Sequence, residues 1–405
     1  MRVLHAPTNI ANQAWLMAEG LRSLGHEVEV WQYGESRYGF PADRVIEHEG
    51  DPSAYFRTFV EAADRDFDVV HFHFAQSLIP ARDYLPRFWD LPVWRSLGVK
   101  IVFTFHGTDV RLRSHHIADD RWSFYRYADI ACDEDQIESN LSVIRRYAHQ
   151  MTVGSVLDSI YVPEATYIPK SVDLATLVPK ANRAGRLPIV LHAPSARSTK
   201  GTKFVLDGLD EVKARGFDFD IDLVEGVTHS ELMDRVARAD IVVEKLLGGD
   251  AGVGSLEAMA FGKVAIARIR DEVLAVHPDL PVVNADPETF ADVLGSLLGD
   301  QQRRKSIGKA GRAYVEREHA PRVTARRLED LYNAPGRTGV PSYPDWTTPE
   351  SQRRTDSWIA RMEKAESAQA ATKELLTQAR GRCEVLTKRL EALQTEHAAV
   401  RPTDG

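Results

Sequence analysis

Two runs of almost uninterrupted apolar residues, 68–74 and 100–105, constrain the fold of this chain most strongly. Strands with apolar side chains on both faces are typical of parallel sheets that helices cover on each side. Ahead of these runs, a strand is predicted at residues 3–6, a helix at 14–24 and a second strand at 27–31. This alternation of strands and helices predicts a doubly wound α/β domain.

The same alternation begins again in the second half of the chain, after a polar, glycine-containing segment at 181–187 that is typical of a linker. Two successive runs of similar length predict two doubly wound domains, 1–180 and 181–347, with a ligand crevice at the carboxyl ends of their strands. The remaining strands are predicted at 127–131, 188–193, 219–224, 240–244, 264–267 and 282–283, and further helices at 202–212 and around Leu232 and Val236.

The last segment, residues 348–405, has a different pattern. Its apolar residues keep mostly to alternating steps of three and four, which is a heptad seam interrupted by polar Gln369, Thr372 and His397 and weakened by Gly381. The pattern predicts a helical tail that forms a coiled-coil homodimer or binds a partner helix. A single solvated helix is the alternative.

The composition narrows the classes of protein. With 405 residues, 43% hydrophobic and 27% charged, the chain is an ordinary globular protein of two or three domains. A net charge of −8 argues against nucleic-acid binding through a broad basic surface. Cys132 and Cys383 are far apart and form no disulfide framework or metal-ligand spacing, so a reducing cytoplasm is expected.

A signal peptide and a membrane span are not expected. The start of the chain runs directly into a strand, and no apolar stretch is long enough to cross a bilayer. A peripheral contact with the inner face of the membrane stays open because of five clustered basic residues, Arg303, Arg304, Lys305, Lys309 and Arg312.

A glycine-rich loop precedes a short helix at residues 252–263, GVGSLEAMAFGK. Such a loop points free backbone N–H groups and the positive end of a helix dipole at a ligand, which suits a phosphate or an electron-rich sugar. Glu257, on the same helix, suits a ribose diol. A plain turn ahead of a helix is the alternative.

The loop after the strand at 188–193 carries Arg197 and Lys200, next to the predicted amino end of the helix at 202–212. Two cations and a helix dipole that converge on one point form a diphosphate site. The alternative is a solvated basic loop, which is what most Arg/Lys pairs are.

Further motifs accompany these two in a fixed order: residues 25–28 (GHEV), 68–71 (DVVH), 105–111 (FHGTDVR), 168–173 (IPKSVD), 239–243 (ADIVV) and 256–263 (LEAMAFGK). Over residues 1–335 the chain thereby resembles the family 4 retaining glycosyltransferases. The resemblance implies a GT-B fold, with two Rossmann-like domains that face a central cleft, the acceptor on the first and the donor on the second. It also implies transfer of a sugar from a nucleotide-diphosphate sugar, most commonly a UDP-sugar, with retention of configuration and without a metal or other cofactor.

The resemblance assigns roles to single residues. Arg197 and Lys200 would hold the donor diphosphate, and His106 would contact a hydroxyl of the transferred sugar. Glu257 would bind the ribose. The rest of the predicted donor site consists of Gly252, Val253, Gly254, Ser255, Asp250 and Glu244.

The chain also departs from the family. Gly249 replaces a second glutamate that normally grips the donor sugar eight residues before Glu257, so Asp250 or Glu244 is expected to substitute with a changed reach. Lys170 and Ser171 replace the usual asparagine-glycine pair. The first loop, residues 8–13, lacks the usual glycines. An acceptor pocket is predicted from Asn9, Asn12, Gln13, His73, Asp109 and Arg111, although Asn12 is expected first of all to cap the following helix.

Three other clusters carry less weight. His71 and His73 share one face of a strand, which is a metal-pair spacing, but no carboxylate or cysteine lies near them in sequence, and no metal site is predicted. Residues 133–135, Asp-Glu-Asp, are interpreted as a helix start. His115 and His116 are interpreted as a solvated loop.

The expected partners are a nucleotide sugar and an acceptor whose chemistry the sequence does not indicate. Three alternatives to a transferase stay open, one of which is a structural dimer module that acts through the tail. Another is a scaffold that binds sugar nucleotides without turnover, which the missing glutamate favours. The third is a nucleotide-sugar epimerase of the same fold.

Overall fold

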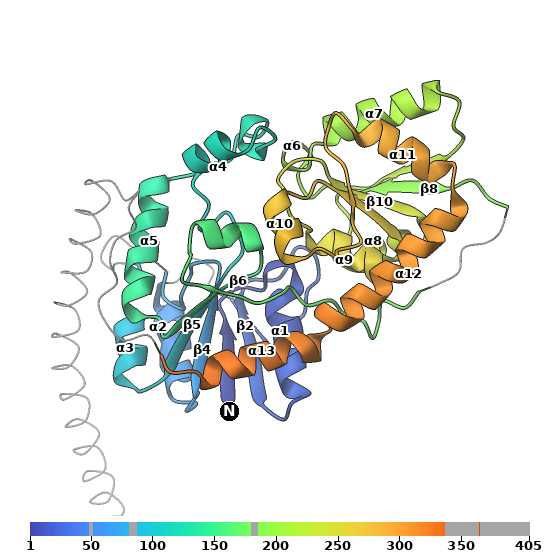
Figure 1. Cartoon of the computed structure of the whole chain (residues 1–405). Helices are drawn as coiled ribbons and strands as arrows, with labels where there is room; N and C mark the ends of the chain where they lie inside the picture. The colour runs from blue at the N-terminus through green and yellow to red at the C-terminus, as the bar shows by residue number, and fades with distance from the viewer. Residues whose placement is uncertain (48–51, 81–86, 180–184, 337–363, 365–405) are drawn as a thin grey trace, which may run out of the picture.

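The computed structural model describes residues 1–47, 52–80, 87–179, 185–336 and Lys364. Two parallel β-sheets lie side by side, each between layers of helices (Figure 1). The prediction of two doubly wound α/β halves is therefore confirmed. The predicted tail, 348–405, lies outside the described residues except for Lys364, so the coiled coil stays a prediction. So does the domain boundary at 180/181, because residues 180–184 are also outside.

The first sheet has seven parallel strands in the order β3-β2-β1-β4-β5-β6-β7. The strands predicted at 3–6, 27–31, 68–74 and 100–105 are confirmed as β1, β2, β4 and β5. The bounds are β1 Arg2–Ala6, β2 Glu27–Tyr33, β3 Arg44–Ile46, β4 Val69–His73, β5 Lys100–Phe105, β6 Gln150–Val153 and β7 Thr166–Tyr167.

Helices cover both faces of this sheet because apolar side chains alternate from one face to the other along each strand. Leu4, Val70 and Phe103 pack towards α2 (Pro52–Ala63), α3 (Leu91–Ser96) and α5 (Glu134–Tyr147). Val3 and Val69 pack towards α1 (Gln13–Arg22) and α13 (Pro321–Asn333). Shorter helical segments are η1 Ile10–Asn12, α4 Arg113–Asp119, η2 Phe124–Arg126 and η3 Val156–Ile160.

The second sheet has five parallel strands in the order β12-β11-β10-β8-β9. One face packs against α7 and α11, and the other against α8, α9 and α12. All five strands confirm sequence predictions. The bounds are β8 Ile189–His192, β9 Asp220–Leu223, β10 Ile241–Lys245, β11 Val264–Ala267, β12 Val283–Asn284, α6 Arg197–Lys200, α7 Thr202–Ala214, α8 His229–Arg238, α9 Val253–Ala260, α10 Asp271–Val276, α11 Phe290–Leu298 and α12 Gln301–Glu318.

Two local predictions are wrong. Residues 127–131 form no strand. Tyr127 instead lies at the contact between the halves, where its ring stacks on Trp122 and meets Phe204 of the second half edge-on. His116 is not solvated: it lies on α4, is 6% exposed, and its Nδ1 lies 2.7 Å from Ser123 Oγ. The helix start at 133–135 is confirmed, since the Asp133 carboxylate caps α5 by accepting from Gln136 N.

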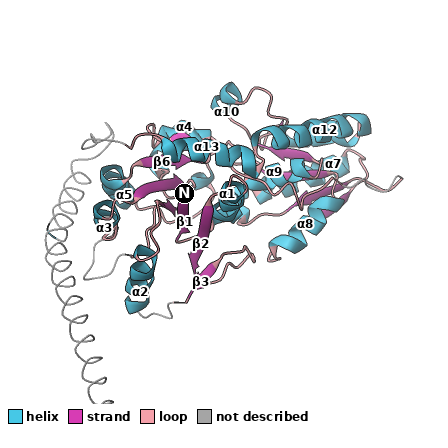
Figure 2. Ribbon diagram, turned by 90° about the horizontal axis from the view of Figure 1, so that it is seen from below, coloured by secondary structure: helices cyan, strands magenta, loops and turns pink. Residues whose placement is uncertain are grey.

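The chain crosses between the halves twice, after β7 and after α12, and α13 returns to pack against α1 (Figures 1 and 2). The two crossings are bonded to each other. Val172 N donates to His319 O over 2.9 Å, and His319 Nδ1 donates to Lys170 O over 2.7 Å. The predicted second domain, 181–347, thus includes a helix that packs on the first sheet. Within the described part of the chain, we find no helix long and apolar enough to cross a membrane.

The close approach of α1 and α13 gives a stability test. A Cβ at Gly20 would lie 2.2 Å from Pro321 O and 2.7 Å from Ala325 Cβ, where neither neighbour has a flexible end that could move away. We expect Gly20→Ala to lower the free energy of unfolding by about 1–3 kcal/mol, measured by urea denaturation. Gly295→Ala, in α11, is the control: its Cβ would meet only the Phe217 ring, at 3.4 Å. That variant should be neutral or stabilised by up to about 1 kcal/mol, and equal stability of the two variants would contradict the packing argument.

Candidate functional site

A cavity of about 590 Å³ lies between the two halves. Asn12, Tyr38 and Phe40 of the first half line it together with His229 and Glu257 of the second half. Residues from both halves therefore form one binding space, as the sequence predicted for a crevice between two doubly wound domains.

Glu257 lies in the wall of this cavity, on α9, and is 8% exposed. Its carboxylate accepts a hydrogen bond from His229 Nε2 over 2.6 Å, and the His229 ring meets Phe40 of the first half. Burial lowers the pKa of His229, but the hydrogen bond and charge of Glu257 outweigh it, so the net pKa is raised. Sequence analysis missed His229, because the contact joins two helices and no local motif marks it.

The amino end of α9 already has an anionic partner, Glu244 at the end of β10. Its carboxylate accepts from Gly252 N over 2.8 Å and from Ser255 Oγ over 2.6 Å, and Lys200 Nζ lies 2.9 Å away. Gly252 leaves the necessary space, since a Cβ there would lie 1.9 Å from Glu244 Oε1. The chain itself thus supplies a carboxylate to the helix terminus at which the sequence predicts an external anion.

Glu244 belongs to a cluster of alternating charges. Although burial opposes ionisation, Lys200 and Lys245 hold the pKa of Glu244 well below its usual range. Burial in turn lowers the pKa of Lys245 to about 8. Lys170, from the first crossing, places Nζ 3.6 Å from Asp250 Oδ2 and 3.2 Å from Ala251 O. The cluster contains three lysines and two carboxylates, so it carries one surplus positive charge when all five are ionised.

Arg197 and Lys200 form ion pairs with different carboxylates, Glu225 and Glu244. The side chain of Arg197 is 54% exposed, and its Nε donates to Glu225 over 2.9–3.0 Å. The two cations stand on the short helix α6, which Gly201, at φ +74°, separates from α7. α6 packs against η2 of the first half, so both residues lie where the two halves meet.

Arg270 fills the space beside Gly249. A Cβ at Gly249 would lie 2.5 Å from Arg270 Cγ and 3.3 Å from Leu157 Cδ1, which excludes the glutamate that the family has at this position. Arg270 in turn pairs with Asp119 of the first half over 2.6 Å. The two predicted substitutes, Asp250 and Glu244, are both engaged with lysines in this structure.

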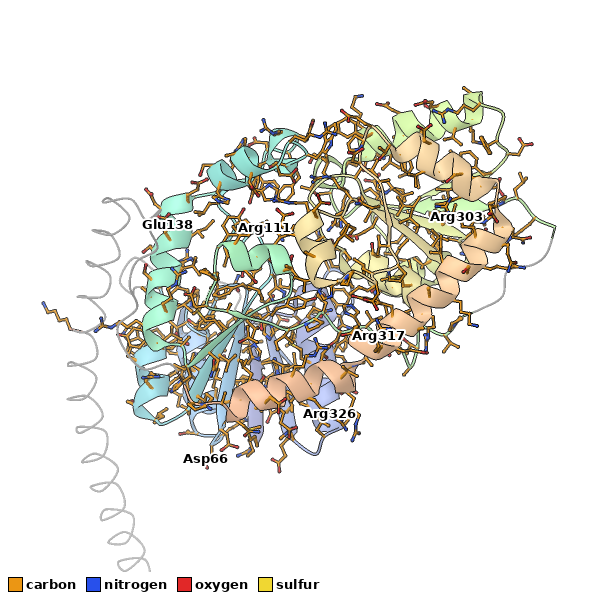
Figure 3. All side chains as sticks on the ribbon, viewed as in Figure 1. Asp66, Arg111, Glu138, Arg303, Arg317 and Arg326 are labelled. Carbon is orange, nitrogen blue, oxygen red and sulfur yellow. The ribbon has the colours of Figure 1, made fainter. Side chains whose placement is uncertain are left out.

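Asp109 and Arg111 shape the loop that holds His106. The Asp109 carboxylate accepts from His106 N over 2.9 Å and from Gly107 N over 2.7 Å, and burial raises its pKa to about 7. Arg111, labelled in Figure 3, donates to Asp158 over 2.8 Å and packs where a Cβ of Gly107 would stand. Gly107 has a φ of +122°, so glycine is required there on both grounds. The His106 side chain stays partly exposed, and burial together with the charge of Lys170 lowers its pKa to about 3.

The first-loop residues make contacts that the sequence did not predict, and the predicted Asn12 cap is wrong. Asn12 does not cap α1: it adopts a left-handed backbone conformation, φ 62°, and its side chain forms no cap bond. Asn9 accepts from Ala14 N over 3.1 Å instead. Gln13 is 2% exposed and binds the backbone of Ser171 through both ends of its amide. His73 is 0% exposed, so a direct acceptor contact is not available to it in this structure.

The predicted basic patch on α12 is partly engaged within the protein. Arg304 donates to Leu298 O, and Arg312 to Ala260 O. Arg303, labelled in Figure 3, donates to Ser296 Oγ over 3.2 Å. These side chains donate to carbonyl and hydroxyl groups of neighbouring segments, so fewer of their N–H groups are free for an external anion, and Arg312 also forms an ion pair with Glu316.

Two family models match the chain. The model described as Glycosyltransferase Family 4 matches residues 10–134, and the model described as Glycosyl transferase-like matches residues 186–330. No curated protein is detectably similar in sequence.

Solved structures share the fold over most of the chain. Sucrose-phosphate synthase from Thermosynechococcus elongatus aligns with a TM-score of 0.57 and 15% identity, covering 82% of this chain and 98% of its own. HepE of Anabaena, solved with UDP and glucose, aligns with a TM-score of 0.56 and 11% identity, and the alignment covers 82% of this chain and 99% of HepE. The catalytic domain of Starch Synthase IV from Arabidopsis thaliana, bound to ADP and acarbose, aligns with a TM-score of 0.54 and 12% identity. This alignment covers 82% of this chain and 98% of that domain. The predicted GT-B fold is thereby confirmed.

The His229–Glu257 pair predicts a pH-dependent contribution to stability. A histidine whose pKa is raised on folding stabilises the protein fully below its unfolded pKa, about 6.5, and loses that contribution as the pH rises through the folded value. We therefore expect the wild type to exceed His229→Gln in unfolding free energy at about pH 5.5 and the difference to shrink by about pH 8.5. Glutamine keeps a donor but no charge. A difference that stays constant between the two pH values, measured by chemical denaturation, would contradict an ionic pair.

Proposed function

The chain belongs to the GT-B glycosyltransferases of the family 4 type, and on that premise we propose that it transfers a sugar from a nucleotide-diphosphate sugar to an acceptor, with retention of anomeric configuration. A uridine diphosphate sugar is the proposed donor. The structure of HepE, of the same fold, contains UDP and glucose, which supports this choice of nucleotide.

One observation carries the proposal: α9 brings the cavity and the charged cluster together. Val253 and Glu257, one helical turn apart, both line the cavity, and Gly252 at the amino end contacts the Glu244–Lys200 pair. A nucleoside whose ribose binds Glu257 would therefore direct its diphosphate towards the amino end of α9. The ribose competes there with His229 for the carboxylate.

Positive charge and free amides are present at that end. The first bond of the α9 turn runs from Ser255 N to Gly252 O, so the amides of Val253 and Gly254 precede the intrahelical ladder and are oriented for an anion. Lys200, held in place by Glu244, and Lys170, from the crossing, stand on the two sides of the cluster. In this proposal these lysines, with Arg197, supply the neutralising charge, and no metal is needed.

The chemistry balances without a protein nucleophile. The bond between the anomeric carbon and the phosphate oxygen breaks, a bond to the acceptor oxygen forms on the same face, and the departing phosphate oxygen takes the acceptor proton. Negative charge grows on the diphosphate during this step, and fixed cations aimed at it stabilise the transition state more than the ground state. Asn12 lines the same cavity as Glu257, so we propose that it contacts the nucleotide and not the acceptor.

A panel of nucleotide sugars tests the proposal directly. Saturation-transfer NMR with UDP-, GDP- and ADP-sugars, combined with an assay of nucleotide release, should show binding and slow release for UDP-sugars first. If no sugar nucleotide binds at millimolar concentration, the proposal is wrong. Binding without release, even with a range of acceptors, would leave the site as a donor-binding scaffold.

Lys200→Ala isolates the contribution of the cluster. One charge-assisted hydrogen bond is worth about 1.5–3 kcal/mol, so we expect a loss of about tenfold to somewhat over a hundredfold in kcat/KM. Lys203→Ala is the matched control, because Lys203 lies three residues further on and its exposed side chain forms an ion pair with Asp207, away from the charged cluster. Equal activity of the two variants would show that Lys200 does not act on the donor.

A further inference from the structure

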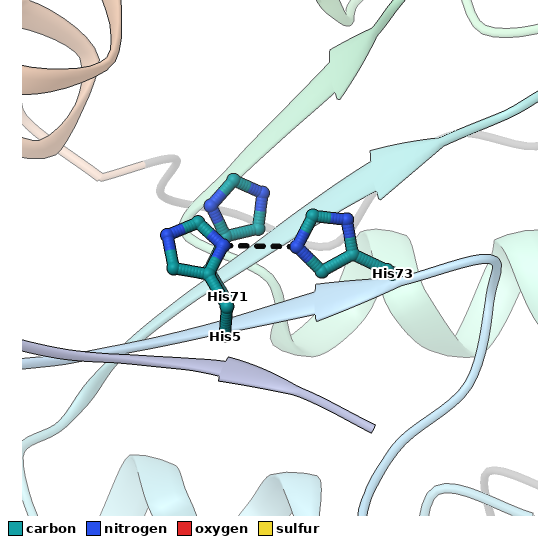
Figure 4. Close-up of side chains that lie close together, drawn as sticks. All are labelled: His5, His71 and His73. Carbon is teal, nitrogen blue, oxygen red and sulfur yellow. Dashed lines mark hydrogen bonds between the residues drawn. The ribbon is translucent and has the colours of Figure 1, made fainter. Parts of the chain in front are cut away.

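Four histidines converge behind the cleft. His5 lies on β1, His71 and His73 lie on β4, and His106 follows β5; Figure 4 shows the first three. His5 is the direct neighbour of His71 in the parallel register, and residues two apart on a strand share a face. All three strand histidines are 0% exposed, on the side of the sheet that α1 and α13 cover.

Their hydrogen bonds form two separate chains. In one, His71 Nδ1 lies 2.6 Å from Tyr332 OH, and His71 Nε2 lies 2.6 Å from Thr104 Oγ1. In the other, His5 Nδ1 lies 2.9 Å from His73 Nε2, and His73 Nδ1 lies 3.1 Å from His106 Nε2. The second chain therefore runs from two fully buried histidines of the sheet to His106, which is partly exposed on the loop after β5.

Hydrogen bonding explains this cluster better than metal binding. The ligand nitrogens of His5, His71 and His73 lie within 4.8 Å of one another. However, the rings of His71 and His73 are stacked, with an interplanar angle of 12° and centroids 4.8 Å apart. The lone pairs of an imidazole lie in the plane of its ring, so stacked rings direct them along parallel planes and not at one point.

Neutral imidazoles allow only two proton arrangements along the second chain. Burial lowers the pKa of His5 and of His106 to about 3 and that of His73 well below its usual value, so all three are neutral near pH 7. A neutral ring has one N–H, and each N···N contact needs one donor. Either His5 Nδ1 donates to His73 and His73 Nδ1 donates to His106, or both bonds run in the opposite direction.

The buried end of the chain decides between these arrangements. His5 Nε2 is buried and has no hydrogen-bond partner among the described residues. If the bonds run towards the cleft, His5 Nε2 carries only a lone pair. If they run inward, His5 Nε2 carries an N–H without an acceptor. A buried donor without an acceptor is the rarer and costlier case in proteins. The bonds therefore run from His5 towards His106.

We propose that His5 and His73 are positioning residues that fix His106 in the tautomer with its proton on Nδ1, so that His106 offers a hydrogen-bond donor to the cleft. Nε2 of His106 accepts from His73, and Nδ1 is the nitrogen left for a ligand. On the proposed function, that ligand is an oxygen of the transferred sugar. A proton on Nδ1 also means that His106 does not act as a base towards the acceptor.

The tautomer can be read without any donor. In ¹⁵N–¹H correlation spectra of the ligand-free protein, assigned with His106→Gln, the proton of His106 is expected on Nδ1. His5→Asp places only an acceptor opposite His73 Nε2, so both bonds should reverse and His106 should take the Nε2–H form. His5→Asn has nearly the same shape but keeps an N–H near the position of Nδ1, so it should retain the wild-type tautomer. Thr104→Val is the control, since it breaks only the His71 chain.

Kinetics provide a second readout if the proposed function holds. His5→Asp should lower kcat about tenfold, the worth of one hydrogen bond, with a smaller effect on KM, and His5→Asn should retain most of the wild-type kcat. A wild-type His106 protonated on Nε2, or a tautomer unchanged in His5→Asp, overturns the proposal even if sugar transfer is confirmed. A confirmed tautomer in a protein that binds no sugar nucleotide refutes the proposed function alone.

Discussion

The site depends on the junction at which the two chain crossings are bonded to each other. Each half supplies only part of the cleft, so the parts are useful only at a fixed separation. Ser171 is bound to Gln13 of α1 and to Thr324 of α13, while its neighbour Lys170 accepts from His319 of the second crossing and reaches Asp250. The segment that joins the halves thus also places the Lys170 ammonium group in the charged cluster. The relative position of the two halves therefore affects the electrostatics of the site.

Internal charges organise the donor side of the cleft. Burying the Glu244–Lys200 pair costs desolvation energy that its attraction need not recover, so such a pair is weak evidence for added stability. Its effect on geometry is clear: it fixes Lys200 beside the amino end of α9 and joins that helix to β10 through Gly252 and Ser255. A lysine already held in one position loses less side-chain entropy when an anion arrives than a free lysine would.

Sequence patterns predicted β1, β2, β4, β5 and the five strands of the second sheet, because apolar runs and period-two alternation are local properties. The short strands β3, β6 and β7 were missed, since they are too brief to show such a pattern. The loop and short helix at α9 were predicted as well, because the glycines that mark them are also a local feature. The partners of the charged residues were not predicted: Lys200 and Glu244 are 44 residues apart, and His229 and Glu257 are 28 apart. Gly249 looked like a simple loss of a glutamate, and only the structure shows Arg270 in its place. His73 was assigned to the acceptor pocket although the apolar run 68–74 already predicted a strand covered on both faces, and in the structure its side chain is fully buried.

Arg270 links the space beside Gly249 to the contact between the two halves. The side chain beside Gly249 is anchored across the gap to Asp119, and Arg268 nearby is anchored in the same way to Asp120 over 2.7 Å. Moving the halves apart would break both ion pairs and free the Arg270 side chain that packs beside Gly249. The shape of the donor side beside Gly249 and the relative position of the two halves are therefore energetically coupled.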